Sequence, residues 1–339
     1  METRLVVSAL AFALLAAVVW HNFREIRQAV SPASFQQETA EDYQKTETES
    51  SSEKEIRAET KSADEQDEEE NVTQLEDEKE EEEEDEENLL PEKSYTLVTA
   101  LFDLGLPSYY DKNLESLKAI LKLDVQLVVF LNKQSTAEVV KSYRSKLEAE
   151  KTLVYLTELD ELPVFQLKDE IEAILTVNQT DTKSAETLRN VLINSKSNFL
   201  ARVAFANPFQ SDYFVWIDVA FGSQPDSLPG EDWTPEFKDE QISVVELERS
   251  HDFSSMAVEE LQRQKETWIS GAFLAGDADA VRELDYSYEE LIIDLIQSGY
   301  AVQDHTVLAL LVRDNPQLFD RKVGLTVDAF ELFAQEFDH

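Results

Sequence analysis

Short apolar runs alternate with amphipathic stretches from Tyr95 onward, and this rhythm restricts the fold more than any other feature. Three runs follow one another: YTLVTALF (95–102), VQLVVFLN (125–132) and TLVYLT (152–157). Runs without polar alternation are typical of strands that are buried on both faces. The stretches between them, 113–123 and 136–150, have the spacing of amphipathic helices. Strand and helix in turn predict an α/β fold, with a mainly parallel sheet and helices on both faces.

The pattern continues toward the C-terminus. The stretch 184–206 predicts one long helix that leads into YFVWID (213–218), the most apolar of the runs. Further strands and helices are predicted at 242–247, 268–276, 278–298 and 306–313. We therefore predict one α/β domain with a single Rossmann-like sheet over residues 93–339.

The first 92 residues form two regions of different character. From Leu5 to Trp20 the sequence is apolar apart from Ser8, which predicts a membrane-spanning signal anchor within residues 1–30. Cleavage of this segment near Ala29-Val30-Ser31 is the alternative. Residues 31–92 are dense in Glu, Asp, Ser and Thr, whose like charges repel, so we expect a disordered acidic stem.

An anchored body suggests a single-pass type II protein of the Golgi or endoplasmic reticulum membrane, with the body in the lumen. The protein would be secreted if the N-terminal segment were cleaved. Two glycosylation sequons, at Asn71 and Asn178, suit a lumenal body. Basic residues flank the apolar span on both sides, so their distribution leaves the orientation open.

Composition excludes several classes of function. The formal net charge is −41, with 71 acidic and 30 basic residues, which argues against a nucleic-acid partner because phosphates attract the opposite sign. The chain has no cysteine, so disulfides, thiolate zinc sites and cysteine nucleophiles are excluded. It has four histidines, which leaves little material for a histidine-rich metal site.

The run YFVWID ends on an acid, Asp218. In doubly wound sheets, ligands bind beyond the carboxyl ends of the strands. A carboxylate at this place can hold a divalent cation or accept a hydrogen bond from a sugar hydroxyl. The alternative is structural, since an aspartate at a strand end often caps the following turn.

Lys196 falls on the apolar stripe of the helix predicted at 184–206. The stripe consists of Leu188, Leu192, Phe199, Leu200 and Val203. A lysine that faces inward needs an anionic partner or must extend to water. A bound phosphate or a nearby carboxylate such as Asp218 would satisfy the first requirement.

Two later motifs carry candidate residues. In WISGAFLAG, Gly271 and Gly276 stand out in a chain with seven glycines, because glycine lets a backbone approach a ligand or bends a strand. In QDHTVL, Asp304 precedes an apolar helical stripe and is a natural helix N-cap. His305 beside it is a candidate base, metal ligand or ordinary surface residue.

The order of these motifs resembles that of the HtrL/YibB family, whose members are taken to be glycosyltransferases. The likeness covers most of the chain from Tyr95 to Phe319 and rests on TLVTALFDLG, NPFQSDYFVWID, SGAFLAG and QDHTVL. It implies a GT-A-like fold, in which one Rossmann-type sheet binds a nucleotide-sugar.

The resemblance also implies roles for individual residues. Asp218 would help to hold a metal-bound diphosphate, with Mn²⁺ or Mg²⁺ as the cation, and Lys196 would face the phosphates or the donor sugar. Asp103, after the first strand, would receive the nucleoside. Gly271 would line the acceptor side, and Asp304 would lie near the reacting carbon.

This chain departs from the family pattern at several of these positions. Family members read Asp-Ala-Gly where it has Asp218-Val219-Ala220, and Gly-Gly where it has Gly271-Ala272. No second acid stands two residues after Asp218, so a metal there needs another ligand, for which His305 is the candidate. The added methyl groups would narrow the site, and a loss of activity is a consistent outcome.

Three functions follow as hypotheses. The first is a membrane-anchored glycosyltransferase that moves a sugar from a nucleotide-sugar to a glycan, lipid or protein acceptor. The second is a catalytically inactive relative that serves as a binding or scaffolding module of the secretory pathway. The third is a calcium-buffering protein in which the acidic stem is the active part.

Overall fold

Seven strands in the described part of the chain form one mixed sheet, in the order β3-β2-β1-β4-β6-β5-β7. The computed structural model describes residues 93–147, 149–178, 183–230, 233–248, 252–264, 266–301 and 303–335. The strands are β1 (Tyr95–Leu101), β2 (Gln126–Leu131), β3 (Thr152–Leu156), β4 (Tyr213–Ile217), β5 (Ile242–Leu247), β6 (Ile269–Gly276) and β7 (Phe319–Gly324). Strand β6 runs antiparallel to β4 and β5, whereas every other neighbouring pair is parallel. The predicted mainly parallel α/β sheet is confirmed.

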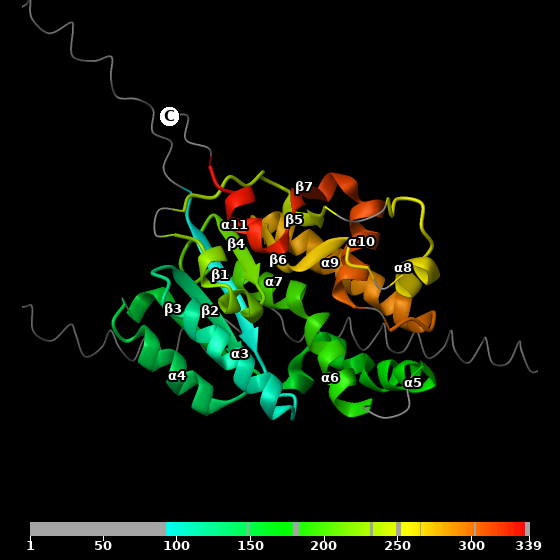
Figure 1. Cartoon of the computed structure of the whole chain (residues 1–339), viewed down its shortest axis with the longest axis horizontal. Coiled ribbons are helices and arrows are strands. Elements are labelled where there is room, and N and C mark those ends of the chain that lie inside the picture. The colour runs from blue at the N-terminus through cyan, green and yellow to red at the C-terminus, as the bar shows by residue number, and fades with distance from the viewer. Residues whose placement is uncertain are drawn as a thin grey trace, which may run out of the picture. The chain divides into compact units, whose positions relative to one another are not determined.

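Helices cover both faces of the sheet, as Figure 1 shows. Helices α3 (Pro107–Ile120), α4 (Gln134–Arg144) and α11 (Ala329–Leu332) pack on one face. The other face carries α5 (Lys168–Asn178), α6 (Lys183–Ile193), α7 (Lys196–Ala206), α8 (Val258–Gln264), α9 (Ala278–Gln297) and α10 (Asp304–Asp314). Each face therefore has its own hydrophobic core.

Strand β4 shows how the sequence builds the two cores at once. Tyr213, Val215 and Ile217 point into the core under α3 and α11, while Phe214 and Trp216 point into the core under α7 and α9. All five side chains are buried because β4 lies between β1 and β6 in the middle of the sheet. Side chains alternate along a strand, so a run with two buried faces must be apolar throughout.

Strand β6 carries an irregularity in its pairing with β5. Val244 of β5 pairs with Leu274 of β6, and Glu246 pairs with Ile269, so β6 has extra residues at this place. Such bulges bend a strand and redirect its side chains, and they are frequent near functional sites. This one contains Gly271.

The predicted helix 184–206 is two helices, because α6 ends at Ile193 and α7 begins at Lys196. The side-chain amide of Asn194 donates to the backbone oxygen of Asn190, and the hydroxyl of Ser195 donates to the backbone oxygen of Val191. Polar side chains that bond to nearby carbonyl groups compete with the helix ladder. The break gives α7 its own N-terminus, with Lys196 as its first residue.

Strand β7 is not among the predicted strands. Its sequence, FDRKVG, has few apolar residues, and it lies at the edge of the sheet beside β5. Edge strands have one open side and do not need a continuous apolar run.

The predicted anchor (1–30), acidic stem (31–92) and sequon at Asn71 lie outside the described residues. Asn178 is the last residue of α5. Within the described ranges, no helix has both the length and the apolar character needed to cross a membrane.

Candidate functional site

Asp218 follows β4 at the carboxyl end of the strand. Its backbone N–H donates to the carbonyl oxygen of Ala272 at 2.9 Å, which continues the β4–β6 pairing by one residue. The indole N–H of Trp216 donates to its Oδ1 at 3.0 Å, and the ammonium of Lys196 donates to its Oδ2 at 3.1 Å. Although Asp218 precedes a short 3₁₀ helix (Val219–Ser223), its side chain makes no capping hydrogen bond there. The capping alternative is therefore wrong.

Lys196 is the centre of the site. The residue is 7% exposed, and its Nζ donates to Asp304 Oδ2 at 2.5 Å, to the carbonyl oxygen of Gly271 at 2.9 Å and to Asp218 Oδ2. An ammonium has three N–H donors, so all of them are directed to protein oxygens. Of the alternatives that the sequence leaves open for Lys196, the structure shows the carboxylate partner, Asp218, and excludes snorkelling to water.

The two acids outweigh the burial of the lysine. Burial lowers the pKa of Lys196, but the charges of Asp218 and Asp304 more than offset this effect and hold its pKa above the ordinary value. Burial raises the pKa of Asp218, and the like charge of Asp304 adds to this while Lys196 opposes it. Two acids share one ammonium, so with both acids ionised the cluster has a net charge of −1.

Asp304 is the first residue of α10 rather than its N-cap. Gln303 occupies the cap position, and no side-chain capping hydrogen bond is present at this end. The predicted N-cap role of Asp304 is therefore wrong, and its carboxylate instead turns to Lys196. The partial positive charge of a helix N-terminus still favours an anion in the first turn.

Gly271 makes room for this ion pair. A Cβ atom at position 271 would lie 2.1 Å from Asp304 Oδ2 and 2.8 Å from its Cγ. These distances are far shorter than any non-bonded contact, so the residue must lack a side chain. The sequence predicts that glycine permits a close approach here, and the approaching group is the Asp304 carboxylate. The acceptor-side role that the resemblance implies for Gly271 stays a prediction.

His305 lies beside the cluster on α10. Its Nδ1 is 3.9 Å from Asp304 Oδ1, and its side chain is 18% exposed. Burial is the largest effect on His305 and lowers its pKa. The charge of Asp304 raises the pKa and that of Lys196 lowers it, so the pKa lies below the ordinary value. The imidazole is therefore neutral at neutral pH.

The carboxylate of Asp103 contacts residues that are not part of the Lys196 cluster. It follows β1, and its carboxylate accepts from the backbone N–H of Gly105 at 2.9 Å and pairs with Lys133. Lys133 also lies over the ring of Tyr110, 4.6 Å from its centroid. Asp103 and Asp218 thus follow the carboxyl ends of neighbouring strands, β1 and β4. A role for Asp103 in nucleoside binding stays a prediction.

Two residues of the site have no place in the predictions. Trp216, which supports Asp218, could have been found because residues two apart in a strand share a face. Tyr288 of α9 donates to Asn194 Oδ1 at 2.7 Å, just before α7 begins. Burial, followed by the charge of Asp304, raises the pKa of Tyr288 well above its ordinary value, so it remains a donor. Only the folded chain brings Tyr288 to this place.

The donor set does not fit Mn²⁺ or Mg²⁺. In the described ranges, no group of three or more His, Asp or Glu side chains is placed to hold a metal ion. The two clustered acids both direct Oδ2 to the Lys196 ammonium. Two like unit charges about 4 Å apart repel by roughly 4 kcal/mol at an effective dielectric constant near 20. The expected second ligand, His305, contacts Asp304 and not Asp218.

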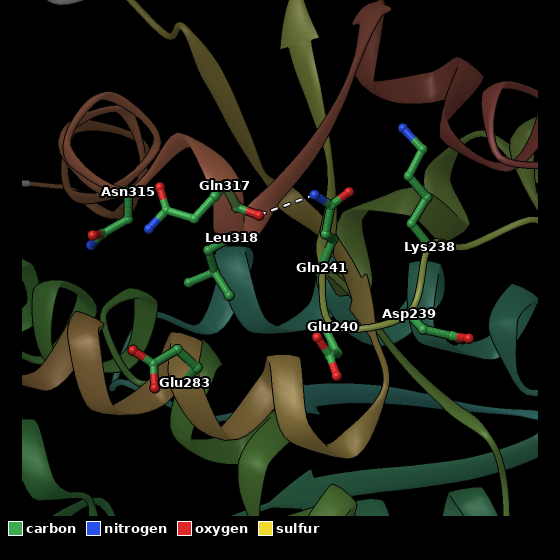
Figure 2. A pocket seen from close by; sticks show the side chains of 8 residues that line it. All are labelled: Lys238, Asp239, Glu240, Gln241, Glu283, Asn315, Gln317 and Leu318. Atoms are coloured by element: carbon green, nitrogen blue, oxygen red, sulfur yellow. Dashed lines mark hydrogen bonds between the residues drawn. The ribbon is translucent and has the colours of Figure 1, made fainter.

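A separate pocket of about 600 Å³ lies at the amino ends of β5 and β7, away from the Lys196 cluster. Figure 2 shows its lining residues, which come from the loop before β5, from Glu283 of α9 and from the turn before β7. The amide of Gln241 donates to the backbone oxygen of Gln317 at 3.0 Å, and Lys238 turns away to Asp320 at 2.5 Å. Its lining includes no residue of the Lys196 cluster.

Comparison with known proteins identifies the family of this chain. The model of a family described as bacterial proteins of unknown function, HtrL_YibB, matches residues 93–335. The chain belongs to the HtrL/YibB family. No curated protein matches it. Among solved structures it is similar to core-mannan synthase A from Aspergillus fumigatus in its Mn/GDP form, with 10% sequence identity and a TM-score of 0.42. This similarity covers 68% of this chain and 72% of that one.

Proposed function

We propose that this HtrL/YibB member is a glycosyltransferase with a GT-A-like fold, which moves a sugar from a nucleotide-sugar to an acceptor hydroxyl. The observation that carries the proposal is the convergence of Lys196, Asp218, Gly271 and Asp304 beyond the carboxyl end of β4. Ligands of open α/β sheets bind at this edge. Side chains from three separate elements meet here around a buried ion pair, which is a costly arrangement for a purely structural role.

The two acids of the cluster differ in their access to a ligand. The side chain of Asp218 is 30% exposed, whereas that of Asp304 is 12% exposed and is held by Lys196. Asp218 is therefore the acid that a ligand can reach. An ionised carboxylate accepts hydrogen bonds but donates none, so it suits the hydroxyl groups of a sugar.

In the proposed transfer, the oxygen of the acceptor hydroxyl bonds to the anomeric carbon of the donor sugar. The bond from that carbon to the nucleoside diphosphate breaks, its electron pair leaves with the phosphate, and the hydroxyl proton passes to a base. Asp218 is the exposed carboxylate available as this base, and ideal bases titrate near the working pH. Its raised pKa is in the favourable direction. Lys196, with all its donors committed, positions Asp218.

A membrane tether through Leu5–Trp20 and a lumenal body in the Golgi or endoplasmic reticulum belong to the same proposal. They rest on the sequence alone: an uncharged apolar run, a polar acidic stretch after it, and sequons at Asn71 and Asn178.

A non-catalytic binding or scaffolding module is the second candidate. Two points favour it. All three hydrogen-bond donors of the Lys196 ammonium are taken by protein oxygens, and methyl groups stand at Ala220 and Ala272, where the resemblance implies glycine. An inactive relative would keep the cluster because the fold needs it.

Titration of the full chain with uridine and guanosine diphosphate sugars, each with and without Mn²⁺, tests both candidates. Saturable binding together with slow release of the free sugar supports a transferase. Saturable binding without release, for every donor and after prolonged incubation, supports the module. No binding at millimolar donor contradicts the proposed nucleotide-sugar site.

A further inference from the structure

The Lys196 ammonium lies where a cation would bridge two acids. Its Nζ contacts Oδ2 of Asp218 and Oδ2 of Asp304, and the carbonyl oxygen of Gly271 completes the set. Carboxylate and carbonyl oxygens are the ligands that Mg²⁺, Mn²⁺ and Ca²⁺ prefer. The three oxygens thus form part of a hard-cation site that is filled by a side chain of the same protein.

The contacts around the ammonium explain why it is held there. The Lys196 side chain is almost completely buried. Trp216 donates a hydrogen bond to one of its partners, Asp218, and another partner, the carbonyl of Gly271, lies in the β6 bulge. Without the ammonium, the two carboxylates would repel each other in a site with little water. The ammonium therefore offsets the repulsion between the two carboxylates.

We propose that Lys196 is a built-in cation that keeps a divalent ion out of the Asp218–Asp304 cluster, and that removing its charge converts the cluster into a divalent-cation site. The inference does not depend on glycosyl transfer, because it concerns only which cation neutralises the two acids. A failure of the sugar-transfer proposal would leave it standing.

The test is a Mn²⁺ titration of the full-length Lys196→Met variant and of the unaltered chain. The electron paramagnetic resonance signal of free Mn²⁺ reports how much of the ion is bound. Methionine is an unbranched side chain that is one atom shorter than lysine and carries no charge. Any Mn²⁺ bound by the acidic run 76–88 is common to both proteins, so the difference between the two titrations is the result. We expect the variant to gain one site with an affinity at least about tenfold above this common background.

Two further variants test whether the new Mn²⁺ site lies in the Asp218–Asp304 cluster. Lys238 pairs with the buried carboxylate of Asp320 at the far edge of the sheet, where a single acid is involved. Lys238→Met is therefore the matched control, and we expect no new site. Adding Asp304→Asn to Lys196→Met removes one of the two acids, and we expect the gained site to disappear. A gain in the Lys238→Met control, or one that survives Asp304→Asn, would overturn the proposal.

The unaltered chain provides a measurement that does not depend on the folding of any Lys196 variant. Trp216 donates to Asp218, so a paramagnetic ion bound to that acid would quench its fluorescence. Up to about 1 mM Mn²⁺, we expect the unaltered chain and Trp216→Phe to show the same quenching, so that none of it comes from Trp216. Quenching of Trp216 in the unaltered chain would show that a divalent ion enters beside Lys196, and it would overturn the proposal. A Lys196→Met variant that folds but gains no site would do the same.

Discussion

The Nζ atom of Lys196 lies 2.5 Å from Oδ2 of Asp304, although 108 positions separate the two residues in the sequence. Both are the first residues of their helices, α7 and α10. A helix N-terminus favours the anion on α10 but disfavours the cation on α7. Lys196 is held in this unfavourable place by two acids, and this contact joins α7 to α10 at the edge of the sheet.

Replacing Lys196 with methionine should strongly destabilise the fold. The change leaves Asp218 and Asp304 facing each other without a counter-ion. Removal of one partner from a buried ion pair costs about 3–5 kcal/mol. We expect a loss of this size in the free energy of unfolding, measured by urea denaturation in the absence of divalent ions. Lys151, which pairs with Asp124 at the surface, is the control, and Lys151→Met should cost well below 1 kcal/mol.

The loss should be partly reversed by a second change. Adding Asp304→Asn to Lys196→Met removes one of the two repelling charges. We expect the double variant to be more stable than Lys196→Met by about 1 kcal/mol or more, because residues in one charged network are not additive. Simple addition of the two single losses would contradict the account of the cluster.

Gly271→Ala should disrupt the site because its methyl group would collide with the Asp304 carboxylate. Overpacking of a tight interior costs about 1–3 kcal/mol. We expect a loss of unfolding free energy in this range, with weaker nucleotide-sugar binding. Gly230 has open space where its Cβ would stand, so Gly230→Ala is the matched control. Equal stability of the two variants would contradict the packing around position 271.

His305 should make stability fall in mild acid. Its folded-state pKa lies below the ordinary value of 6.5 because burial disfavours the imidazolium. Between the folded pKa and 6.5 the unfolded chain binds more protons, so stability decreases as the pH is lowered through this window. In His305→Gln, the free energy of unfolding should depend less on pH, by up to about 1.4 kcal/mol per unit. Parallel pH curves for the two proteins, from urea melts between pH 7 and 5, would contradict this assignment.

The sequence predicts the central strands of this fold better than the break between two of its helices or the edge strand β7. The central strands are legible because each is buried on both faces, as in YFVWI from Tyr213 to Ile217. The break between α6 and α7 is hidden because the apolar stripe runs through it, while the hydrogen bonds of Asn194 and Ser195 decide the backbone. Strand β7 depends on its pairing with β5, which no local pattern records.

For the site, the sequence places Lys196 on the apolar stripe of its helix and offers Asp218 as one of the partners that a buried amine could have. It misplaces Asp304 as a cap, because a cap and a first-turn residue differ by one position and by where the side chain turns. The third contact, to the carbonyl oxygen of Gly271, depends on the bulge in β6. The sequence marks this glycine as a place of close approach or bending, but not the group that approaches it.

The most direct test of the nucleotide-sugar site is calorimetric titration of the full chain and of its Asp218→Asn variant with the donors that bind. Asparagine keeps the shape of Asp218, removes the charge that Lys196 and Trp216 hold, and replaces an acceptor with a donor. Asp239, which is exposed and remote from Lys196, provides Asp239→Asn as the control. We predict at least about a tenfold loss of donor affinity for Asp218→Asn, equivalent to roughly 1.4 kcal/mol, and no change for Asp239→Asn. Equal donor affinity in Asp218→Asn and the unaltered chain would contradict the claim that this cluster forms the binding site.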